Sequence, residues 1–502
     1  MSIVKLTAED GYIVEFEDHD GSPPKQGGIK DVYFTTDKKY AVAFYRKKLD
    51  SVAEERLERI VNRYRKNIFE QVGGNYWKEI FCWPERVVKE GTKTGILVPF
   101  YDKKFFFGPS NGGDDFLEGS EKEGKWFTSA KNFNLFVPVN QKGDLQGYLS
   151  VCQQLSRGVK KLHMSGLAHS DLSYKNCLVD PVTGSACIID IDGLVVPGLF
   201  PPDVIGTKDF IAPEVVATAH LKDDQRKLPC QDTDLHALSV LIYEYLFHRH
   251  PLEGDKVHDQ DPEIQLLLEM GEKALFIENP FDTSNRKTVK SDDGDFLPWI
   301  DTNKLPYVIT GPYLKELFDK AFIKGLHNPY ERPTADDWDV AISRTKDLLL
   351  PCSNKKCSMK WFIYDRKSAP VCPYCGTTYN ESLPILDFYS TKSGDKYVLE
   401  NRQLIVYNNL NLYLWHVYKN IFPNETLEDK FKKPVGHFSF QKNKWYFVNQ
   451  TLGSMRDITD TNNPIMIPIN GKVEISYGKT LKFADENTSR IAYIRLTNTP
   501  HS

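Results

Sequence analysis

Residues Leu167–Asp180 read LAHSDLSYKNCLVD, and they are the most informative part of the sequence. Within it, Asp171 is followed five positions later by Asn176, and apolar residues flank the pair. A loop of this kind can direct a carboxylate at a hydroxyl group while a nearby amide oxygen reaches a metal ion. The stretch therefore predicts a phosphoryl-transfer site with Asp171 as its central carboxylate and Asn176 as a ligand of Mg²⁺.

The next informative stretch is CIIDIDGLVVPG, residues 187–198. Its two isoleucines are expected to form a strand that delivers Asp190 to the same cleft, where a carboxylate can hold Mg²⁺ against nucleotide phosphates. Asp192 is a further candidate for this Mg²⁺ site, although the alternation of side chains along a strand favours Asp190. Asp190 follows Asp171 by 19 positions, which leaves room for a strand, a turn and a returning strand.

This order of elements resembles the protein-kinase fold. By that resemblance, His169 belongs to the catalytic loop, and the sequence DIDG that starts at Asp190 stands where the fold has its metal-binding Asp-Phe-Gly. The segment GTKDFIAPE, which ends at Glu214, is similar to the substrate-binding segment ending in Ala-Pro-Glu. Asp234 matches the aspartate that braces the catalytic loop, and Arg332 matches the arginine that pairs with Glu214. The resemblance implies ATP as cofactor, with Mg²⁺ or Mn²⁺.

Two departures from the kinase pattern bear on regulation and substrate. Ser170 stands in place of the usual arginine, so we expect no docking of a phosphorylated activation loop. Ser173 stands where serine/threonine kinases carry a lysine, and we expect Lys175 to steady the charge of the transferred phosphoryl group instead. The Gly206-Thr207 segment looks like the serine/threonine form, so the expected acceptors are Ser and Thr hydroxyls of a protein substrate.

The N-terminal part of the chain carries the weaker signals for nucleotide binding. Gly27 and Gly28 can let backbone N–H groups approach phosphate oxygens. A cation must also neutralise these phosphates, yet Tyr45 stands where the strand Val-Ala-Ile-Lys of kinases has its lysine. The candidate residues for the nucleotide site are Lys30, which is favoured as the cation, Arg46 as the alternative cation, Glu58 or Glu54 as the helix partner of the cation, and Val98 in the strand and hinge beside adenine.

Four of the nine cysteines lie within 24 positions. They are Cys352, Cys357, Cys372 and Cys375, and their spacing is that of two metal knuckles separated by a short hairpin. Four thiolates in a tetrahedral array suit Zn²⁺, and a closed four-cysteine shell is structural because it leaves no position for water. The segment resembles a zinc ribbon.

After the cysteines, strand-like pieces alternate with Asn/Gly turns, a pattern typical of an all-β sandwich. The sequence from Trp445 to Gly478 resembles the second half of forkhead-associated domains. Those domains bind phosphothreonine, but Gly436-His437 replaces their usual Gly-Arg, and a phosphate needs a cationic or multi-donor cradle. We therefore leave open whether this domain binds phosphopeptide or docks proteins in another way.

These observations predict a multi-domain α+β chain. Residues 1–348 are expected to form a bilobal protein-kinase-like domain, with an N-lobe of about 1–100 and a C-lobe of about 101–348. Residues 349–382 are expected to form a small zinc ribbon, and residues 383–502 a β-sandwich that resembles a forkhead-associated domain. The Gly-rich, charged stretch 108–126 is expected to be a surface insertion.

Composition restricts the class of protein. The formal net charge of −4 and the pI of about 6.3 do not favour nucleic acid as a partner. The most apolar stretch, Leu238–Phe247, is about half the length that a membrane crossing needs. No signal-peptide pattern opens the chain, and nine cysteines are too few for a disulfide scaffold, so we expect a cytoplasmic protein.

The whole arrangement resembles the bacterial kinases of tellurite-resistance-type (TerY-like) phosphorylation triads. That resemblance implies a stress or defence circuit in which a cognate phosphatase and a von Willebrand A-type protein are partners. Two other hypotheses remain open. A pseudokinase scaffold, which binds nucleotide and partners without catalysis, is favoured by the missing strand lysine. A small-molecule phosphotransferase is favoured by Asp192 and opposed by the Ala-Pro-Glu segment.

Overall fold

The computed structural model describes residues 2–18, 25–26, 29–110, 116–202, 206–222, 224–290, 293–365, 369–379, 381–393 and 396–497. The chain forms two compact units. The first unit comprises Met1–Tyr307 and Glu316–Asp339, and the second comprises Val308–Lys315 and Val340–Ser502.

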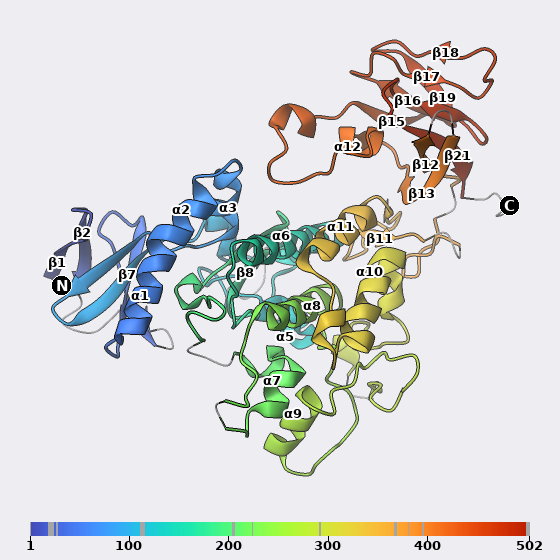
Figure 1. Ribbon diagram of the computed structural model, residues 1–502. Coiled ribbons are helices and arrows are strands. Elements are labelled where there is room, and N and C mark those ends of the chain that lie inside the picture. The colour runs from blue at the N-terminus through green and yellow to red at the C-terminus, as the bar shows by residue number, and fades with distance from the viewer. Residues whose placement is uncertain are drawn as a thin grey trace. The chain divides into compact units, whose positions relative to one another are not determined.

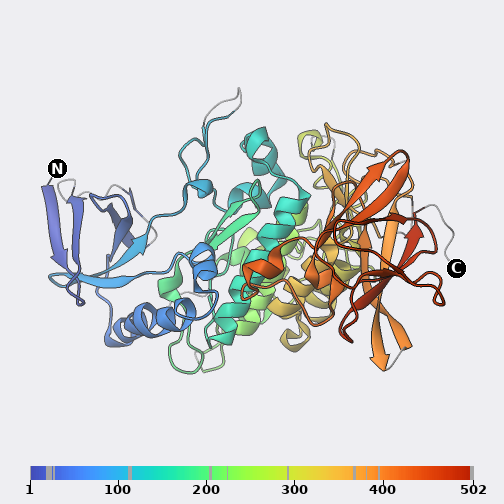
Figure 2. The ribbon, with the colours of Figure 1, turned by 90° about the horizontal axis from the view of Figure 1, so that it is seen from above.

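The first unit begins with a β-rich N-lobe, drawn in blue in Figures 1 and 2. A five-stranded antiparallel sheet has the strand order β3-β4-β5-β7-β6, and a hairpin of β1 and β2 precedes it. The strands are β1 (Ser2–Thr7), β2 (Ile13–Asp18), β3 (Lys25–Gln26), β4 (Lys30–Phe34), β5 (Tyr40–Tyr45), β6 (Arg86–Glu90) and β7 (Lys93–Pro99). The helical segments are α1 (Ser51–Arg59), η1 (Ile60–Tyr64), α2 (Arg65–Phe69) and α3 (Gly74–Ile80).

Helix α1 packs on the sheet through its apolar face. Leu57 on α1 and Val61 on η1 share a buried cluster with Ala43 and Ile96 from the central strands β5 and β7. The four-residue spacing of Leu57 and Val61 puts both side chains on one face of the helix. The helix does not stay α-helical throughout, because it passes into a π-helical turn at η1 before continuing as α2.

The rest of the first unit is the helical C-lobe, drawn in cyan to yellow in Figures 1 and 2. Its two long helices are α6 (Leu145–Met164) and α8 (Gln231–Phe247). Every residue of α8 from Thr233 to Phe247 is buried, and apolar side chains lie on all sides of this helix. The other elements that lie wholly in the first unit are η2 (Lys103–Phe105), α4 (Lys125–Thr128), α5 (Ala130–Leu135), η3 (Val139–Gln141), β8 (Cys177–Asp180), β9 (Ser185–Ile188), η4 (Ile191–Gly193), η5 (Lys208–Phe210), α7 (Pro213–Thr218), α9 (Pro262–Met270), η6 (Gly294–Phe296), η8 (Lys320–Lys324) and η9 (Pro329–Glu331). Three elements contribute residues to both units, namely η7 (Tyr307–Thr310), α10 (Gly311–Asp319) and α11 (Ala335–Lys346).

The expectation of a surface insertion at 108–126 is wrong for its second half. The ammonium group of Lys122 lies 2.8 Å from the carboxylate of Asp180, and both side chains are buried. The N–H of Gly124 donates to the carbonyl of Cys177 at 2.9 Å. These contacts fasten the segment to the β8–β9 hairpin, so Lys122 and Gly124 serve close packing rather than exposure.

The second unit is rich in antiparallel sheet. One sheet has the order β13-β12-β21-β20-β17-β18, a second has β14-β15-β16-β19, and β10 and β11 form a hairpin. The elements are β10 (Leu349–Pro351), β11 (Trp361–Ile363), β12 (Pro384–Ser393), β13 (Lys396–Ile405), β14 (Asn411–Leu412), α12 (Leu414–Val417), η10 (Asp429–Lys432), β15 (Gly436–Gln441), β16 (Lys444–Asn449), β17 (Arg456–Asp457), β18 (Ile465–Met466), β19 (Lys472–Ile475), β20 (Thr480–Lys482) and β21 (Arg490–Leu496). The sequence prediction that strands dominate the C-terminal part is confirmed.

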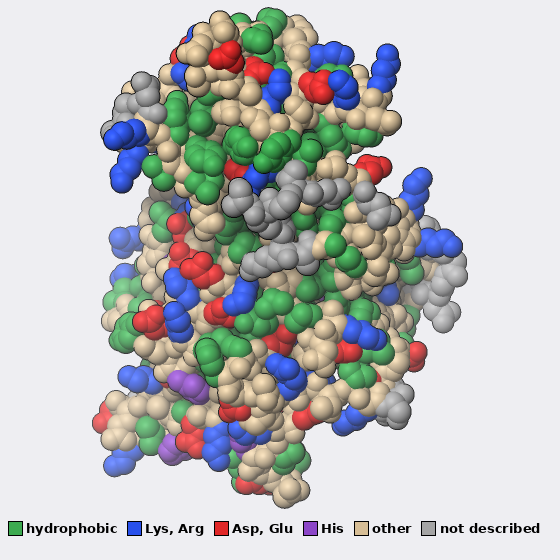
Figure 3. Space-filling model, turned by 90° about the vertical axis from the view of Figure 1, so that its right-hand side faces the viewer, with side chains coloured by type: hydrophobic (Ala, Val, Ile, Leu, Met, Phe, Trp, Pro, Cys, Tyr) green, Lys and Arg blue, Asp and Glu red, His purple; other side chains and the backbone are tan. Residues whose placement is uncertain are grey.

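The molecular surface carries charges of both signs. On the face drawn in Figure 3, Lys and Arg side chains are interspersed with Asp and Glu side chains. This mixture agrees with the small net charge of −4. In the part of the chain that the structure describes, each helix is too short or too polar to cross a membrane.

Candidate active site

The loop that carries Asp171 is held by the first turn of the buried helix α8. The Asp234 carboxylate accepts hydrogen bonds from the backbone N–H groups of His169, at 2.7 Å, and Ser170, at 3.0 Å. The ring Nε2 of His163 lies 3.1 Å from the same carboxylate. Because Asp234 is buried, its two backbone contacts fix the loop with little competition from water.

Ser170 adopts a left-handed backbone conformation with φ of 66°. Such a conformation is uncommon for a residue other than glycine and persists where surrounding contacts enforce it. The hydrogen bond from its N–H to Asp234 supplies such a contact. The ring Nε2 of His169 also lies 3.0 Å from the carbonyl oxygen of Ile189, which ties the loop to the residue before Asp190.

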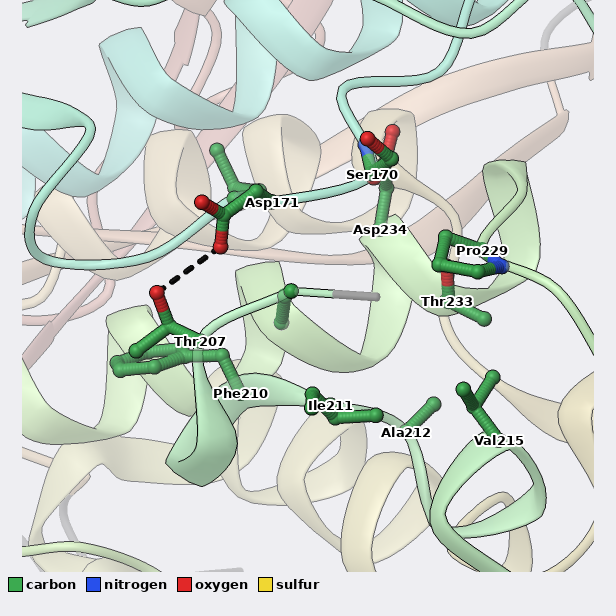
Figure 4. Close-up of a pocket in the computed structure, with 13 residues that line it drawn as sticks. Ser170, Asp171, Thr207, Phe210, Ile211, Ala212, Val215, Pro229, Thr233 and Asp234 are labelled. Carbon is green, nitrogen blue, oxygen red and sulfur yellow. Dashed lines mark hydrogen bonds between the residues drawn. The ribbon is translucent and has the colours of Figure 1, made fainter. Parts of the chain in front are cut away.

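Asp171 is directed by two neighbouring side chains. The amide of Asn176 donates to the Asp171 carboxylate at 3.0 Å and to its backbone carbonyl at 2.8 Å. The hydroxyl of Thr207 donates to the other carboxylate oxygen at 2.9 Å (Figure 4). The Asn176 amide oxygen is not used in these bonds, so the arrangement leaves this oxygen as a candidate metal ligand.

The Thr207 contact was not predicted from the sequence, although Thr207 lies within the segment singled out there. Gly206 permits this contact because its φ of 118° is a conformation that other residues rarely adopt. A Cβ atom at Gly206 would also lie 3.3 Å from the Ser170 carbonyl oxygen. The Asp171 loop, this segment and the start of α8 line a small cavity of about 10 Å³ (Figure 4).

Asp190 lies at the end of the β8–β9 hairpin, directly beside the Asp171 loop. The backbone N–H of Ile189 donates to the carbonyl of Asn176 at 3.0 Å, which places Asp190 next to the residues that flank Asp171. Asp190 has φ of 60°, and its side chain is 48% exposed. Three oxygen donors, from Asp171, Asn176 and Asp190, thus come from adjacent backbone segments, and such oxygens suit Mg²⁺.

Lys30 reaches this region from the N-lobe. Its ammonium nitrogen lies 3.0 Å from the Asp190 carboxylate and 2.6 Å from the Asp192 carboxylate. Tyr45 is paired with Lys30 across strands β4 and β5, and its hydroxyl donates to Asp192. The position where kinases carry a strand lysine therefore holds a tyrosine, and the lysine of the neighbouring strand enters the site.

Burial and neighbouring charges have opposite effects on the pKa of Lys30. Burial alone would lower its pKa, but the carboxylates of Asp192 and Asp190 outweigh this effect and raise the pKa. Burial likewise favours the neutral form of Asp192, whereas Lys30 and the Tyr45 hydroxyl lower its pKa. The pKa of Tyr45 is raised by burial and by Asp192. A charged lysine, a charged carboxylate and a neutral phenol therefore share one enclosed site.

The other residues predicted to bind nucleotide either lie away from Asp190 and Asp192 or fall outside the described residues. Gly27 and Gly28 lie outside the described residues. Arg46 pairs with Asp31 at 2.7 Å, and Glu58 is exposed on α1. Lys30 is paired with Asp190 and Asp192 rather than with Glu58, and the side chains that α1 buries are those of Arg56 and Leu57.

Two more predicted residues lie near the site. Val98 packs beside a buried cluster that includes Leu178 of β8, at the junction of the two lobes. Lys175 is exposed, and its backbone N–H donates to the Ser173 hydroxyl at 3.3 Å. Its side chain lines a groove of about 560 Å³ on the C-lobe.

Glu214 and Arg332 form the ion pair that the sequence predicts. Two guanidinium nitrogens of Arg332 donate to the two Glu214 carboxylate oxygens at 2.8 and 2.7 Å. Arg332 also donates to the carbonyls of Gly325 and Asp232 at 2.9 Å each. The pair joins the start of α7, just after the Gly206 segment, to the first turn of α8.

The four clustered cysteines form a separate candidate metal site in the second unit. Their sulfur atoms all lie within 4.8 Å of one another. A close set of four thiol groups fits a tetrahedral Zn²⁺ ion. The chain forms a knuckle at Cys372, where the N–H of Gly376 donates to the Cys372 carbonyl at 2.8 Å and Gly376 has φ of 70°.

Comparisons with known proteins agree with this geometry. The family described as protein kinase domain matches residues 131–338. The serine/threonine-protein kinase PSK1 of Saccharomyces cerevisiae is 32% identical over 113 residues, which cover 21% of this chain and 8% of that protein. The serine/threonine-protein kinase PSK2 of the same yeast is 28% identical over 143 residues, or 26% of this chain and 12% of that protein.

The chain thus spans about a tenth of the length of these curated relatives. It contains a protein kinase domain, accompanied by further sheet-rich regions. The matched residues begin at α5, so the strand that carries Lys30 lies outside the match.

Proposed function

We propose that the chain is an ATP-dependent protein kinase that transfers the γ-phosphate of ATP to Ser or Thr hydroxyls of a protein substrate. The observation that carries this proposal is the arrangement of Asp171, which is oriented by Asn176 and Thr207, beside the segment that delivers Asp190. The similarity of part of the chain to two proteins named as serine/threonine-protein kinases also supports Ser and Thr as the acceptors.

Asp171 is proposed to accept the proton of the acceptor hydroxyl. The hydroxyl oxygen then forms a bond to the γ-phosphorus as the bond between this phosphorus and the ADP oxygen breaks. The two hydrogen bonds to Asp171 orient its carboxylate, and proximity of this kind supplies much of the rate in phosphoryl transfer. Lys175 is proposed to steady the charge on the transferred group from the edge of the loop.

Asn176 and Asp190 are proposed to hold Mg²⁺ or Mn²⁺, and Lys30 to bind the phosphates that ATP retains. The metal, when bound, neutralises charge on the β- and γ-phosphate oxygens. Lys30 suits its role because its ammonium group stays protonated within a buried, acidic site. Asp192 was predicted as a further metal ligand, but its enclosure by Lys30 and Tyr45 favours Asp190.

A transfer assay tests the proposal and separates it from a pseudokinase scaffold. Purified full-length chain is incubated with labelled ATP, Mg²⁺ and candidate acceptor proteins, in parallel with Asp171→Asn and Asp190→Asn. We expect label on protein Ser or Thr, reduced about 100-fold or more in both variants. Binding of ATP without transfer to any acceptor would support the scaffold instead, and label on a small molecule would support the third hypothesis.

The second unit is proposed to contain a zinc ribbon around Cys352, Cys357, Cys372 and Cys375, followed by a β-sandwich that resembles a forkhead-associated domain. The close sulfur atoms and the two antiparallel sheets support these assignments. Membership of a bacterial TerY-like circuit, with a phosphatase and a von Willebrand A-type protein as partners, is proposed on sequence resemblance alone. Co-purification of the tagged chain with those two proteins tests it.

A further inference from the structure

The carboxylate closest to Lys30 comes from the loop after Asp190. The Lys30 ammonium lies 2.6 Å from Asp192, and the Tyr45 hydroxyl donates to the same carboxylate oxygen. The Lys30 and Asp192 side chains are only 14% and 6% exposed. A buried cation needs a fixed counter-charge, and two donors on one carboxylate oxygen fix the position of this one.

Helix α1 presents a positive charge toward this cluster. Arg56 is the buried charged residue of α1, and its guanidinium lies within electrostatic range of Asp192 and Tyr45. It also donates to the carbonyl of Pro201 at 3.0 Å. A cation on this face of the helix would repel Lys30, so the helix is poorly suited to anchor the lysine.

The three carboxylates of α1 have other surroundings. Glu54 accepts a hydrogen bond from the Thr94 hydroxyl at 3.2 Å. Glu55 pairs with Arg59 one turn further along the helix, and Glu58 is exposed. Among the described residues, the ion-pair partners of Lys30 are instead Asp190 and Asp192.

We infer that Asp192, oriented by Tyr45, is the positioning residue that holds Lys30 ready for nucleotide phosphates, in place of a carboxylate from helix α1. This inference rests on the proposed function because it takes Lys30 as the phosphate-binding cation. Asp190 is half exposed and can exchange Lys30 for another partner, whereas the enclosed Asp192 keeps its contact. Assembly of the nucleotide site therefore depends on the loop at 190–193 and not on the position of α1.

A double-mutant cycle on nucleotide binding tests this inference in the full chain. The dissociation constant of a fluorescent, non-transferable ATP analogue with Mg²⁺ is measured for the wild type, Asp192→Asn, Lys30→Met and the double variant. We expect Asp192→Asn to bind about tenfold more weakly, as when the partner of a binding group is removed. The double variant should bind no more weakly than Lys30→Met alone, because Asp192 acts through Lys30.

Two further variants keep the test decisive. Tyr45→Phe removes one hydroxyl, and we expect binding about threefold weaker, with the same dependence on Lys30. Glu55→Gln removes a carboxylate of α1 that has its own partner, and it should bind as the wild type does. If Asp192→Asn does not fold, as thermal unfolding would show, the cycle of Tyr45 with Lys30 replaces it.

Three results would overturn the inference. The first is that Asp192→Asn binds the ATP analogue with wild-type affinity. The second is that the losses of affinity of the two single variants multiply in the double variant, as a merely structural role predicts. The third is that Glu58→Gln loses as much affinity as Asp192→Asn. Because the readout is binding, the inference can be judged even when no acceptor is phosphorylated, which would defeat the proposed function alone. Asp171-dependent transfer without coupling between Asp192 and Lys30 would defeat only the inference.

Discussion

Asp234, in the first turn of α8, accepts the backbone N–H groups of both His169 and Ser170. The carboxylate is buried and lies 65 and 64 positions from these partners in sequence. One side chain therefore determines the backbone path that leads into Asp171. Since the loop's left-handed residue is Ser170, the strain of this conformation is held by the same carboxylate.

We expect Asp234→Ala to reduce both stability and phosphoryl transfer. The change leaves two N–H groups without their acceptor, and each such buried group costs about 1–3 kcal/mol. Urea unfolding measures the loss of stability, and transfer under conditions where the variant is folded measures the effect on the loop. Asp234→Asn, which retains one acceptor oxygen, should lie between the wild type and Asp234→Ala. Unchanged transfer in Asp234→Ala would contradict the bracing role.

The pair of Arg332 and Glu214 should also be needed for stability. Arg332 is almost fully enclosed, with 1% of its side chain exposed, and Glu214 is partly buried at 22%. Glu214→Gln leaves the guanidinium without its counter-charge, and breaking such a pair costs about 3 kcal/mol. Urea unfolding measures this loss. The matched change Asp485→Asn, in a more exposed pair with Arg456, should cost much less. Equal losses of stability in the two variants would show that burial does not determine how much each ion pair contributes.

Zinc content tests the four-cysteine site. We expect about one zinc per chain, measured by elemental analysis of the purified protein, and its loss in Cys372→Ser. Because four thiolates hold the segment together through the metal, removal of zinc should also open residues 352–379 to proteases. Cys230→Ser, which changes a cysteine outside the cluster, should retain the zinc and the protease resistance. Full zinc content in Cys372→Ser would contradict the site.

Acid should weaken the second unit through Asp347. Burial favours its neutral form, but Arg402 and His416 outweigh this effect and lower its pKa below the model-compound value of 3.8. A carboxyl group whose pKa is lower in the folded state gives stability above its unfolded pKa, and this stability is lost as pH falls through the folded pKa. We therefore expect the calorimetric transition of the second unit to fall to lower temperature as pH decreases below about 4.

Asp347→Asn supplies the comparison for this pH dependence. At neutral pH the variant should be less stable by about 3 kcal/mol, because Arg402 is left in the interior without its counter-charge. Below pH 4 the difference from the wild type should shrink, since the wild-type carboxyl group is then losing its charge. Asp429→Asn removes an almost fully exposed carboxylate and should follow the wild type. A constant difference at all pH values would exclude Asp347 as the titrating group.

The sequence predicted the C-lobe contacts better than the N-lobe contacts for a physical reason. Asp171, Asn176 and Asp190 lie on one loop and the hairpin after it, so their short spacing almost determines that they meet. Lys30, by contrast, reaches Asp192 across 162 positions, and its place opposite Tyr45 depends on strand register. Register is set by tertiary packing, which a single sequence does not display.

The burial of Arg56 on α1 and of Asp192 after β9 could not be predicted from the sequence for related reasons. The spacing of Leu57 and Val61 identifies the face of α1 that packs on the sheet, but it does not show that the charged Arg56 is buried as well. The π-helical turn η1 then changes the helical period. Strand alternation was applied to Asp192, but the chain leaves the strand at Asp190, where φ is 60°, and turns into η4. Because the chain turns at this left-handed residue, strand alternation no longer applies to Asp192, whose side chain is buried.

Two glycines of α6 offer a last test, because they share one helix but meet different neighbours. A Cβ atom at Gly147 would lie 1.8 Å from the carbonyl oxygen of Pro181, in the turn between β8 and β9. At Gly158 it would meet the flexible end of Ile188 at 2.7 Å. Alanine adds about 1 kcal/mol of helix propensity at either position, so propensity cannot separate the two variants. We expect Gly147→Ala to destabilise by about 2–3 kcal/mol, because backbone must move, and Gly158→Ala by less.

The Gly147 change should also affect the site. Displacement of Pro181 shifts the hairpin that ends at Asp190, so Gly147→Ala should lower the affinity for the ATP analogue with Mg²⁺ even where it is fully folded. Gly158→Ala reaches the hairpin only through a side chain that can change its rotamer, and its affinity should stay near that of the wild type. Urea unfolding and analogue binding on the two variants check this. Equal effects on affinity would show that the contact between α6 and the Pro181 turn does not set the position of Asp190.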